Sequence, residues 1–346
     1  MANRSVRVAV NGYGVIGKRV ADAISAQPDM ELVGVADVVS DYRMKVAETL
    51  GLPIYAALPE KVDEMRASGL TIQGALDDLL KRIDVIVDCT PKGIGARNLE
   101  RYRAAKIRSI FQGGEKHALT GHSFVAQANY SSALGRESTR VVSCNTTSIV
   151  RTLSALRDAG LLKKARGVLV RRATDPWESD HSGVMNTVVP ERSVPSHQGP
   201  DAQSVIPELD VVTIAMVAAH TTSHLHAWSV ELTREATKDD VLAAFRAAPR
   251  IAFLRASDGI VALNSTIELM ADLGRPRGDM WEVGLWEDSL TVTGNEVFYT
   301  YQVYNQAIVV PETIDAVRAL TELERDGFES IAMTDKALGV TRQFIN

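Results

Sequence analysis

The sequence predicts an α/β protein with a doubly wound parallel sheet first and a domain with a mixed or antiparallel sheet after it. Two observations favour this fold class. Short apolar strands alternate with helical patterns over residues 1–115, which is typical of a parallel sheet covered on both faces. After about residue 145, longer segments rich in β-branched residues follow one another, which is typical of antiparallel pairing.

The expected elements follow from these patterns. In the first region the strands are Val6–Val10, Glu31–Ala36, Ile83–Asp88 and Ser109–Phe111, and the helices are Val15–Ala26, Asp41–Leu50 and Leu99–Ala105. In the second region the strands are Gly167–Ala173, Val211–Ala218, His224–Leu232, Ile251–Arg255, Leu290–Thr293 and Val297–Tyr304, and the helices are Thr147–Asp158, Lys238–Ala247 and Ser265–Leu273. Residues 175–200 are expected to form a long irregular loop, and Pro311 to open a last helix over Glu312–Glu324.

Length and composition set the limits of the interpretation. The chain has 346 residues, which suits about two domains, and 45% hydrophobic with 23% charged residues is ordinary for globular proteins. A net charge of −5 argues against a nucleic-acid partner. No apolar window reaches the length of a membrane span, no signal-peptide pattern opens the chain, and two cysteines are too few for a disulfide framework. We therefore expect a cytoplasmic protein without nucleic-acid or membrane partners.

Residues 11–17 read Asn-Gly-Tyr-Gly-Val-Ile-Gly between a predicted strand and a predicted helix. In this context Gly12 makes the tight turn, Gly14 lets the backbone approach a pyrophosphate, and Gly17 allows close helix–strand packing. Asp37 follows Gly17 by the spacing at which an acidic residue binds the ribose hydroxyls. The alternative is a glycine-rich turn with a coincidental aspartate. We predict a dinucleotide site that prefers NAD, with NADP left open as a second cofactor.

Cys144 lies where an apolar strand is expected to meet a helix, among the polar residues of Ser-Cys-Asn-Thr-Thr. A helix N-terminus lowers the pKa of a thiol and so favours the reactive thiolate, although a buried structural cysteine is the alternative. Of the seven histidines, His220, His224 and His226 share one face of a predicted strand, and each is a candidate base. No Cys, Asp or Glu at ligand spacing completes a metal site with them, so none is expected.

A nicotinamide site together with an activated thiol indicates aldehyde oxidation. The thiolate attacks the aldehyde, hydride leaves to the cofactor, and the resulting thioester is released by water or phosphate. Arg171, Arg172 and the Ser196-His197 loop are candidates for holding phosphate. A chain that binds NAD without catalysis would have no use for the thiol and the histidines.

Several stretches resemble the archaeal-type class of phosphorylating glyceraldehyde-3-phosphate dehydrogenase. They are VNGYGVIGKRVADAI from Val10, FQGGEK from Phe111, RVVSCNTT from Arg140, VPSH from Val194 and IVVPExIDAVRA from Ile308. The resemblance implies a Rossmann domain (1–143) completed by a returning C-terminal helix in 311–346, and a catalytic domain (144–310). It also implies a homotetramer that converts glyceraldehyde 3-phosphate and phosphate reversibly to 1,3-bisphosphoglycerate in glycolysis or gluconeogenesis. Related enzymes for aspartate semialdehyde or phosphorylated erythrose are the alternatives.

The resemblance also implies roles for single residues. Cys144 takes the place of the nucleophile and His224 that of the base. The implied substrate or phosphate contacts are Ser143, Asn145, Thr146, His197 and Gln198, and the implied cofactor contacts are Val15, Ile16, Gly114, Arg172 and Asn305.

Three departures from the family's pattern matter. Asp37-Val38 stands where Lys-Thr is common, which favours NAD because a carboxylate repels the 2′-phosphate of NADP. The threonine pair before His224 is displaced by one residue, which leaves His220 and His226 open as the base. His197-Gln198 replaces a pair of histidines.

Overall fold

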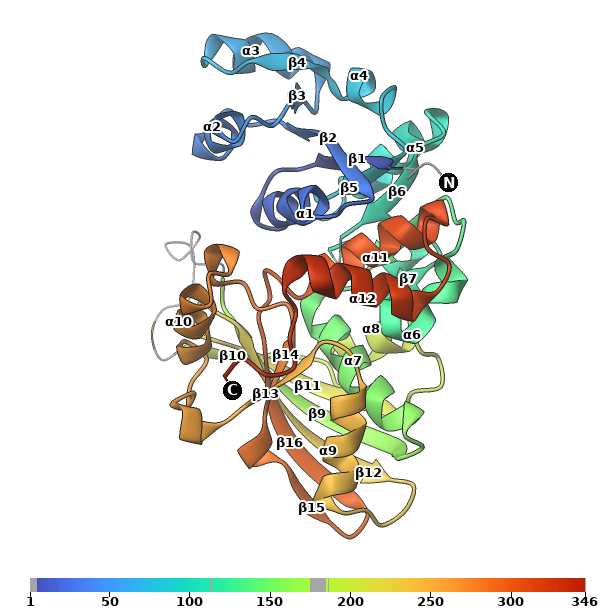
Figure 1. Cartoon of the computed structure of the whole chain (residues 1–346), viewed down its shortest axis with the longest axis vertical. Helices are drawn as coiled ribbons and strands as arrows, with labels where there is room; N and C mark the ends of the chain where they lie inside the picture. The colour runs from blue at the N-terminus through green and yellow to red at the C-terminus, as the bar shows by residue number, and fades with distance from the viewer. Residues whose placement is uncertain (1–4, 113, 175–184, 186, 346) are drawn as a thin grey trace. The chain divides into compact units, whose positions relative to one another are not determined.

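The computed structural model describes residues 5–112, 114–174, 185 and 187–345, and the chain divides into two compact units (Figure 1). The first unit comprises Met1–Ser143 and Val310–Leu338, and the second comprises Cys144–Val309 and Gly339–Asn346. The predicted first domain was to include all of 311–346. The last residues differ because Arg275 donates a hydrogen bond to the Gly339 carbonyl at 2.8 Å and Glu282 accepts one from the Thr341 N–H at 2.8 Å, both within the second unit.

In the described part of the first unit, eight strands form one sheet in the order β4-β3-β2-β1-β5-β6-β8-β7, and all the pairings between them are parallel. The strands are β1 (Val6–Asn11), β2 (Met30–Asp37), β3 (Ile54–Ala56), β4 (Ile72–Ala75), β5 (Val85–Asp88), β6 (Arg108–Phe111), β7 (Ser123–Phe124) and β8 (Ser138–Val141). The helices that connect them are α1 (Val15–Ser25), α2 (Tyr42–Thr49), α3 (Val62–Ala67), α4 (Leu76–Leu80), α5 (Gly95–Ala104) and α6 (Ala126–Asn129). The chain reverses its direction of winding between β1 and β5, the place where doubly wound folds bind ligands.

The sheet of the first unit is held by apolar side chains that point toward its helices. Ala9, Ala36 and Ile86 from the strands belong to one buried cluster with Leu79 of α4 and Leu99 of α5. Burying each leucine or isoleucine side chain of this cluster contributes about 1.5–3 kcal/mol. The predicted doubly wound parallel sheet is thus confirmed.

The C-terminal helices α11 (Val309–Thr321) and α12 (Gly327–Leu338) complete the first unit. Arg318 of α11 is fully buried and donates to Asp29 at 2.7 and 2.9 Å, to Gln27 at 2.7 Å and to Thr334 of α12 at 2.6 Å. Such a fully hydrogen-bonded buried charge fixes both helices against the chain between α1 and β2. The returning helix is confirmed, whereas α12 was not predicted, although Asp326 caps its start by accepting from the N–H of Phe328 at 2.8 Å.

The second unit contains a mixed sheet in the order β10-β11-β9-β12-β16-β14-β13, with β15 paired to β16. The strands are β9 (Leu162–Arg172), β10 (Val188–Pro190), β11 (Val211–Ala218), β12 (His224–Leu232), β13 (Ile251–Leu254), β14 (Val283–Trp286), β15 (Thr291–Thr293) and β16 (Glu296–Val303). Only β11 with β9 and β13 with β14 run parallel among the described strands of this sheet. The predicted mixed or antiparallel sheet is confirmed.

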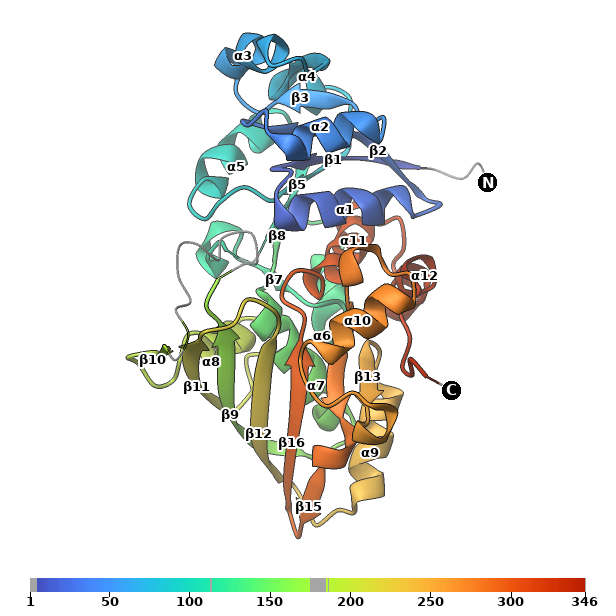
Figure 2. The ribbon, with the colours of Figure 1, turned by 90° about the vertical axis from the view of Figure 1, so that its left-hand side faces the viewer.

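Over the described residues of this unit, the helices that accompany the sheet are α7 (Cys144–Asp158), α8 (Gln198–Gln203), α9 (Lys238–Ala247) and α10 (Ser265–Asp272). Helix α7 packs against β9 and β16 and is flanked by α8 and α9, and Figure 2 shows it behind the strands. The loop predicted over 175–200 contains β10 and the start of α8, while residues 175–184 and 186 lie outside the described residues. Over the described residues, no helix combines the length and the apolar character that crossing a membrane requires.

Candidate active site

The glycine loop of the first unit joins β1 to α1, and its three glycines have different steric roles. Gly12 has a φ of +93°, and a Cβ there would lie 2.8 Å from the Cys89 backbone. A Cβ on Gly17 would lie 1.8 Å from the carbonyl oxygen of Gly12, whereas one on Gly14 would meet nothing within 4 Å. The chain itself therefore requires Gly12 and Gly17, and Gly14 leaves open space beside the N-terminus of α1, as a bound pyrophosphate requires.

Asp37 is the last residue of β2 and its carboxylate lies beside this loop. One oxygen accepts a hydrogen bond from the Tyr13 N–H and the other from the Val38 N–H, both at 2.7 Å. Each carboxylate oxygen keeps a lone pair for a further donor, such as a ribose hydroxyl. Val15 and Ile16 open α1, and Gly114 follows β6 in the same unit. These residues fit a dinucleotide cofactor.

The thiol of Cys144 lies beside an imidazole in the second unit. Cys144 is the first residue of α7 and His224 the first of β12, and Sγ lies 3.4 Å from Nε2 of His224. On the other side of the ring, the N–H of Arg172 in β9 donates to Nδ1 at 3.1 Å. Because Nδ1 accepts a hydrogen bond, the neutral ring carries its proton on Nε2 and directs it at the sulfur.

Burial controls the protonation of this pair. Burial raises the pKa of the Cys144 thiol, and the charge of Arg172 and the N–H of Asn145 offset this only in part. Burial also lowers the pKa of His224 well below its ordinary value, and the charges of His226 and Arg172 lower it further. A lowered thiol pKa was expected from the start of the helix alone, and here desolvation outweighs that effect.

The other two candidate histidines are engaged elsewhere. His226 is fully buried, with Nε2 2.8 Å from Oδ1 of Asn145 and Nδ1 2.9 Å from the Tyr301 hydroxyl. His220 lies before β12, with its Nε2 3.1 Å from the Ser223 carbonyl, to which it donates. Of these three histidines, His224 is the one in contact with the sulfur. Among the described residues, no three His, Cys, Asp or Glu side chains are arranged to hold a metal ion.

The residues implied as substrate contacts near Cys144 have partners within the protein. Asn145 binds His226 through its amide oxygen, and Thr146 donates from Oγ1 to Asp201 of α8 at 2.7 Å. Ser143 directly precedes Cys144 in the chain. Contact of Ser143, Asn145 and Thr146 with substrate stays a prediction.

The loop before α8 carries the candidates for holding phosphate. Ser196 is fully buried and its hydroxyl lies 2.7 Å from that of Thr213, so it serves the fold. His197 is exposed, and its Nδ1 lies 2.8 Å from Oε1 of Glu191. The other carboxylate oxygen of Glu191 lies 3.3 Å from Nη1 of Arg171. Gln198 is fully buried, and neither of its amide atoms has a hydrogen-bond partner among the described residues.

Two residues of this region escaped the sequence analysis, Glu191 and Asp201. Both stand in a proline-rich stretch without periodicity, so no spacing separates them from surface carboxylates. The one local signal is the position of Asp201 in the first turn of α8, where acidic residues are favoured.

Arg172 and Asn305, implied as cofactor contacts, belong to the second unit, whereas the glycine loop and Asp37 belong to the first. Their contact with the cofactor stays a prediction.

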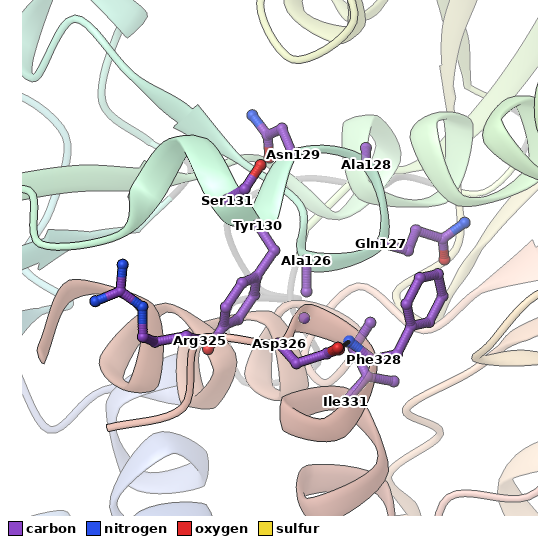
Figure 3. A pocket seen from close by; sticks show the side chains of 11 residues that line it. Ala126, Gln127, Ala128, Asn129, Tyr130, Ser131, Arg325, Asp326, Phe328 and Ile331 are labelled. Carbon is purple, nitrogen blue, oxygen red and sulfur yellow. Dashed lines mark hydrogen bonds between the residues drawn. The ribbon is translucent and has the colours of Figure 1, made fainter. Parts of the chain in front are cut away.

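A further pocket, of about 340 Å³, opens in the first unit (Figure 3). It lies between residues 126–131, which include α6, and the start of α12. Tyr130 and Phe328 line it, and none of the predicted site residues does.

Comparison with known proteins places the chain. Residues 143–275 match the family described as glyceraldehyde 3-phosphate dehydrogenase, C-terminal domain, and residues 6–114 match the one described as dihydrodipicolinate reductase, N-terminus. The chain is 44% identical to the glyceraldehyde-3-phosphate dehydrogenase of Methanobrevibacter smithii over 335 residues, which cover 96% of this chain and 99% of that one. It is 42% identical to that of Methanothermus fervidus over 334 residues (96% and 98%), and 44% identical to that of Thermococcus sibiricus over 337 residues (97% and 99%). These nearly full-length matches to archaeal proteins confirm the resemblance, and the chain belongs to the glyceraldehyde-3-phosphate dehydrogenase family.

Proposed function

We propose that this protein catalyses the reversible oxidation of D-glyceraldehyde 3-phosphate with inorganic phosphate to 1,3-bisphosphoglycerate, as an oxidoreductase of glycolysis or gluconeogenesis. The observation that carries the proposal is the contact between Sγ of Cys144 and Nε2 of His224 at the start of a buried helix. The names and the identity of the archaeal relatives support it. The glycine loop supports a nicotinamide cofactor, which when bound supplies the hydride acceptor.

Cys144 is proposed as the nucleophile. Its thiol first loses a proton to solvent, and the thiolate then forms a bond to the aldehyde carbon while the carbonyl oxygen becomes an alkoxide. When the alkoxide collapses, the carbon releases hydride and a thioester remains on Cys144. Inorganic phosphate then attacks the thioester carbon, the C–S bond breaks, and the thiolate is restored.

His224 is proposed to stabilise the alkoxide. The predicted role as general base requires a free lone pair on Nε2, and the hydrogen bond from the Arg172 N–H opposes this because it keeps the proton of the neutral ring on Nε2. With that proton in place, His224 donates to the sulfur and then to the alkoxide, in the manner of an oxyanion hole. In this sequence of steps the alkoxide needs no base.

We propose NAD as the preferred cofactor. The carboxylate of Asp37 lies at the end of β2 beside the glycine loop, where it attracts ribose hydroxyls and repels a 2′-phosphate. Arg43, whose charge interacts with that of Asp37, is itself bound to Asp41 by hydrogen bonds at 3.0 Å.

A homotetramer is also proposed, on the basis of the family and of one apolar sheet face. Ile214 of β11, Val168 of β9 and Ala227 of β12 are register neighbours and form a row across three strands. Ile214 is 46% and Val168 38% exposed, and they line a hollow of about 320 Å³ with Trp228. An exposed apolar row of this kind is typical of an interface between copies of one chain. The mass of the protein in sedimentation experiments tests this.

One absorbance assay tests the proposed function. The purified protein is mixed with D-glyceraldehyde 3-phosphate, with NAD or NADP, and with or without inorganic phosphate. We expect sustained reduction of the cofactor that depends on phosphate, with a higher kcat/KM for NAD than for NADP. Parallel assays with aspartate semialdehyde and erythrose 4-phosphate should give much lower kcat/KM. A preference for either of these aldehydes would reassign the substrate, and turnover independent of phosphate would exclude phosphorolysis.

A further inference from the structure

The loop between β10 and α8 holds a carboxylate–imidazole pair in the same unit as the proposed nucleophile. The loop backbone is fixed on β11, because the N–H of Glu191 donates to Ala215 and the N–H of Ser196 to Thr213, each at 2.8 Å. Glu191 then reaches Nδ1 of His197 at 2.8 Å. The His197 side chain is 60% exposed, so its other nitrogen is accessible to a small anion.

The partners of His197 and of His224 have opposite effects on the two rings. Glu191 is an acceptor, so Nδ1 of His197 carries the proton and Nε2 of the neutral ring has a free lone pair. At His224 a backbone N–H occupies Nδ1, and Nε2 carries the proton. One ring is therefore arranged to donate a proton or hydrogen bond from Nε2, and the other to accept a proton there.

Contacts on two sides place this pair near Cys144. Arg171 binds Glu191 and is the chain neighbour of Arg172, whose N–H holds His224. By strand alternation Arg171 shares with buried Leu169 the sheet face that α7 covers.

On the other side, α8 begins directly after His197. Asp201 of α8 accepts a hydrogen bond from Thr146, which follows Cys144 by two residues.

Gln198 provides an independent sign of a ligand. Its side chain is fully buried, directly after His197, and both amide atoms lack a hydrogen-bond partner among the described residues. A buried amide without partners is unfavourable, and such a group calls for an explanation, of which a bound ion is one. Nε of Arg171 likewise has no partner among the described residues. Both groups donate hydrogen bonds, as an anion requires.

We propose that His197, oriented by Glu191, accepts the proton of inorganic phosphate as the phosphate attacks the thioester on Cys144. This inference rests on the proposed function. The P–OH oxygen of HPO₄²⁻ forms the bond to the acyl carbon, its proton passes to Nε2 of His197, and the C–S bond breaks to release the Cys144 thiolate. The products are the acyl phosphate, the thiolate and an imidazolium, and the charge balances. In this step Glu191 is a positioning residue.

The charges around the pair suit this transfer. Burial raises the pKa of Glu191, but the hydrogen bond and the charge of His197 lower it more, so that the pKa lies below its ordinary value and the carboxylate stays ionised. The carboxylate stabilises the imidazolium that forms, as a buried aspartate does in a catalytic triad. The positive charge of Arg171 disfavours the imidazolium, but Arg171 is itself paired with Glu191. The other carboxylate of this region, Asp201 of α8, accepts a hydrogen bond from Thr146.

Rapid mixing separates this step from the earlier ones. The enzyme is mixed with NAD and D-glyceraldehyde 3-phosphate, and the first turnover of NADH is recorded, followed by the steady rate as inorganic phosphate is varied between pH 6 and 9. The variants are Glu191→Gln, Glu191→Asp and His197→Asn. Glu208→Gln serves as the control, because Glu208 is an exposed carboxylate of the same unit whose partner is Arg157.

We expect the Glu191 variants and Glu208→Gln to keep the amplitude and the rate of the first turnover. The phosphate-dependent kcat should fall about 10²-fold or more in His197→Asn and about tenfold in Glu191→Gln, with partial rescue in Glu191→Asp. The pH profile of that step should also change in Glu191→Gln. A rise in the KM for phosphate with unchanged kcat and pH profile, or a loss of the first turnover equal to the loss of steady rate, would overturn the proposal. Absence of a first turnover in the unmodified enzyme would instead refute the proposed function.

Discussion

The cofactor loop of the first unit and the thiol site of the second are built in different ways. The cofactor loop presents mainly backbone, through three glycines, and adds the carboxylate of Asp37. All four residues lie within a single β-α-β segment. The thiol site is made of side chains, and its two central residues are 80 positions apart in the chain. Substitutions should therefore act on the loop by steric exclusion and on the thiol site by removing a chemical group.

The largest effect is expected from the thiol itself. Cys144→Ser should lower turnover about 10⁴-fold or more, because a hydroxyl of high pKa replaces the nucleophile. Binding of NAD, measured by fluorescence or calorimetry, should remain. Cys89→Ser is the matched control in the first unit, since burial raises the pKa of Cys89 well above its ordinary value and makes that thiol unreactive. Full activity of Cys144→Ser would refute the thiol mechanism.

Next comes the imidazole, where two substitutions distinguish two roles. His224→Ala should slow turnover by about 10²–10⁴-fold. The side chain in His224→Gln can donate a hydrogen bond to the alkoxide but cannot take up a proton. If His224 donates, His224→Gln should be about tenfold faster than His224→Ala, which corresponds to one hydrogen bond to a charged group. Equal rates of the two variants would restore the general-base role.

In the cofactor loop, two alanine substitutions should differ in kind. Gly14→Ala adds a methyl group to open space, so the melting temperature of the free protein should hardly change, while the Kd for NAD rises about tenfold or more. Gly17→Ala places a methyl group against the Gly12 carbonyl and should destabilise the first unit by about 1–3 kcal/mol or more. Unchanged NAD affinity in Gly14→Ala would show that the pyrophosphate does not pass over this glycine.

This difference also explains what the sequence could predict. The glycine loop and Asp37 were found because a local spacing determines them, and Cys144 because polar residues cluster where a strand meets a helix. The choice among His220, His224 and His226 was open because all three were placed on one predicted strand face. The pairing of β12 with β9 and the position of α7 decide which ring meets the sulfur, and no local pattern encodes either. Glu191 was missed for the same reason, since its partners are Arg171 of β9 and His197, which directly precedes α8.

The last comparison concerns stability and takes one buried histidine from each unit. Burial holds the pKa of His226 at about 3 and that of His122 of the first unit at about 4. Between these values and about 6.5 the unfolded chain binds more protons than the folded one, so stability falls as the pH drops through this range. At pH 5 His226 should account for a loss of about 2 kcal/mol relative to neutral pH.

His226→Gln removes this titration while keeping donors and acceptors for Asn145 and Tyr301. Hydrogen exchange, which reports on each unit separately, should show a smaller loss of protection in the second unit of this variant between pH 7 and 5. His122→Gln should have the same effect on the first unit and none on the second. Both histidines lower the stability of their unit at acidic pH by the same mechanism. If His122→Gln changes the pH dependence of its unit and His226→Gln does not, water must reach the His226 ring beside Asn145. The thiol site would then be less buried than the contacts of His226 indicate.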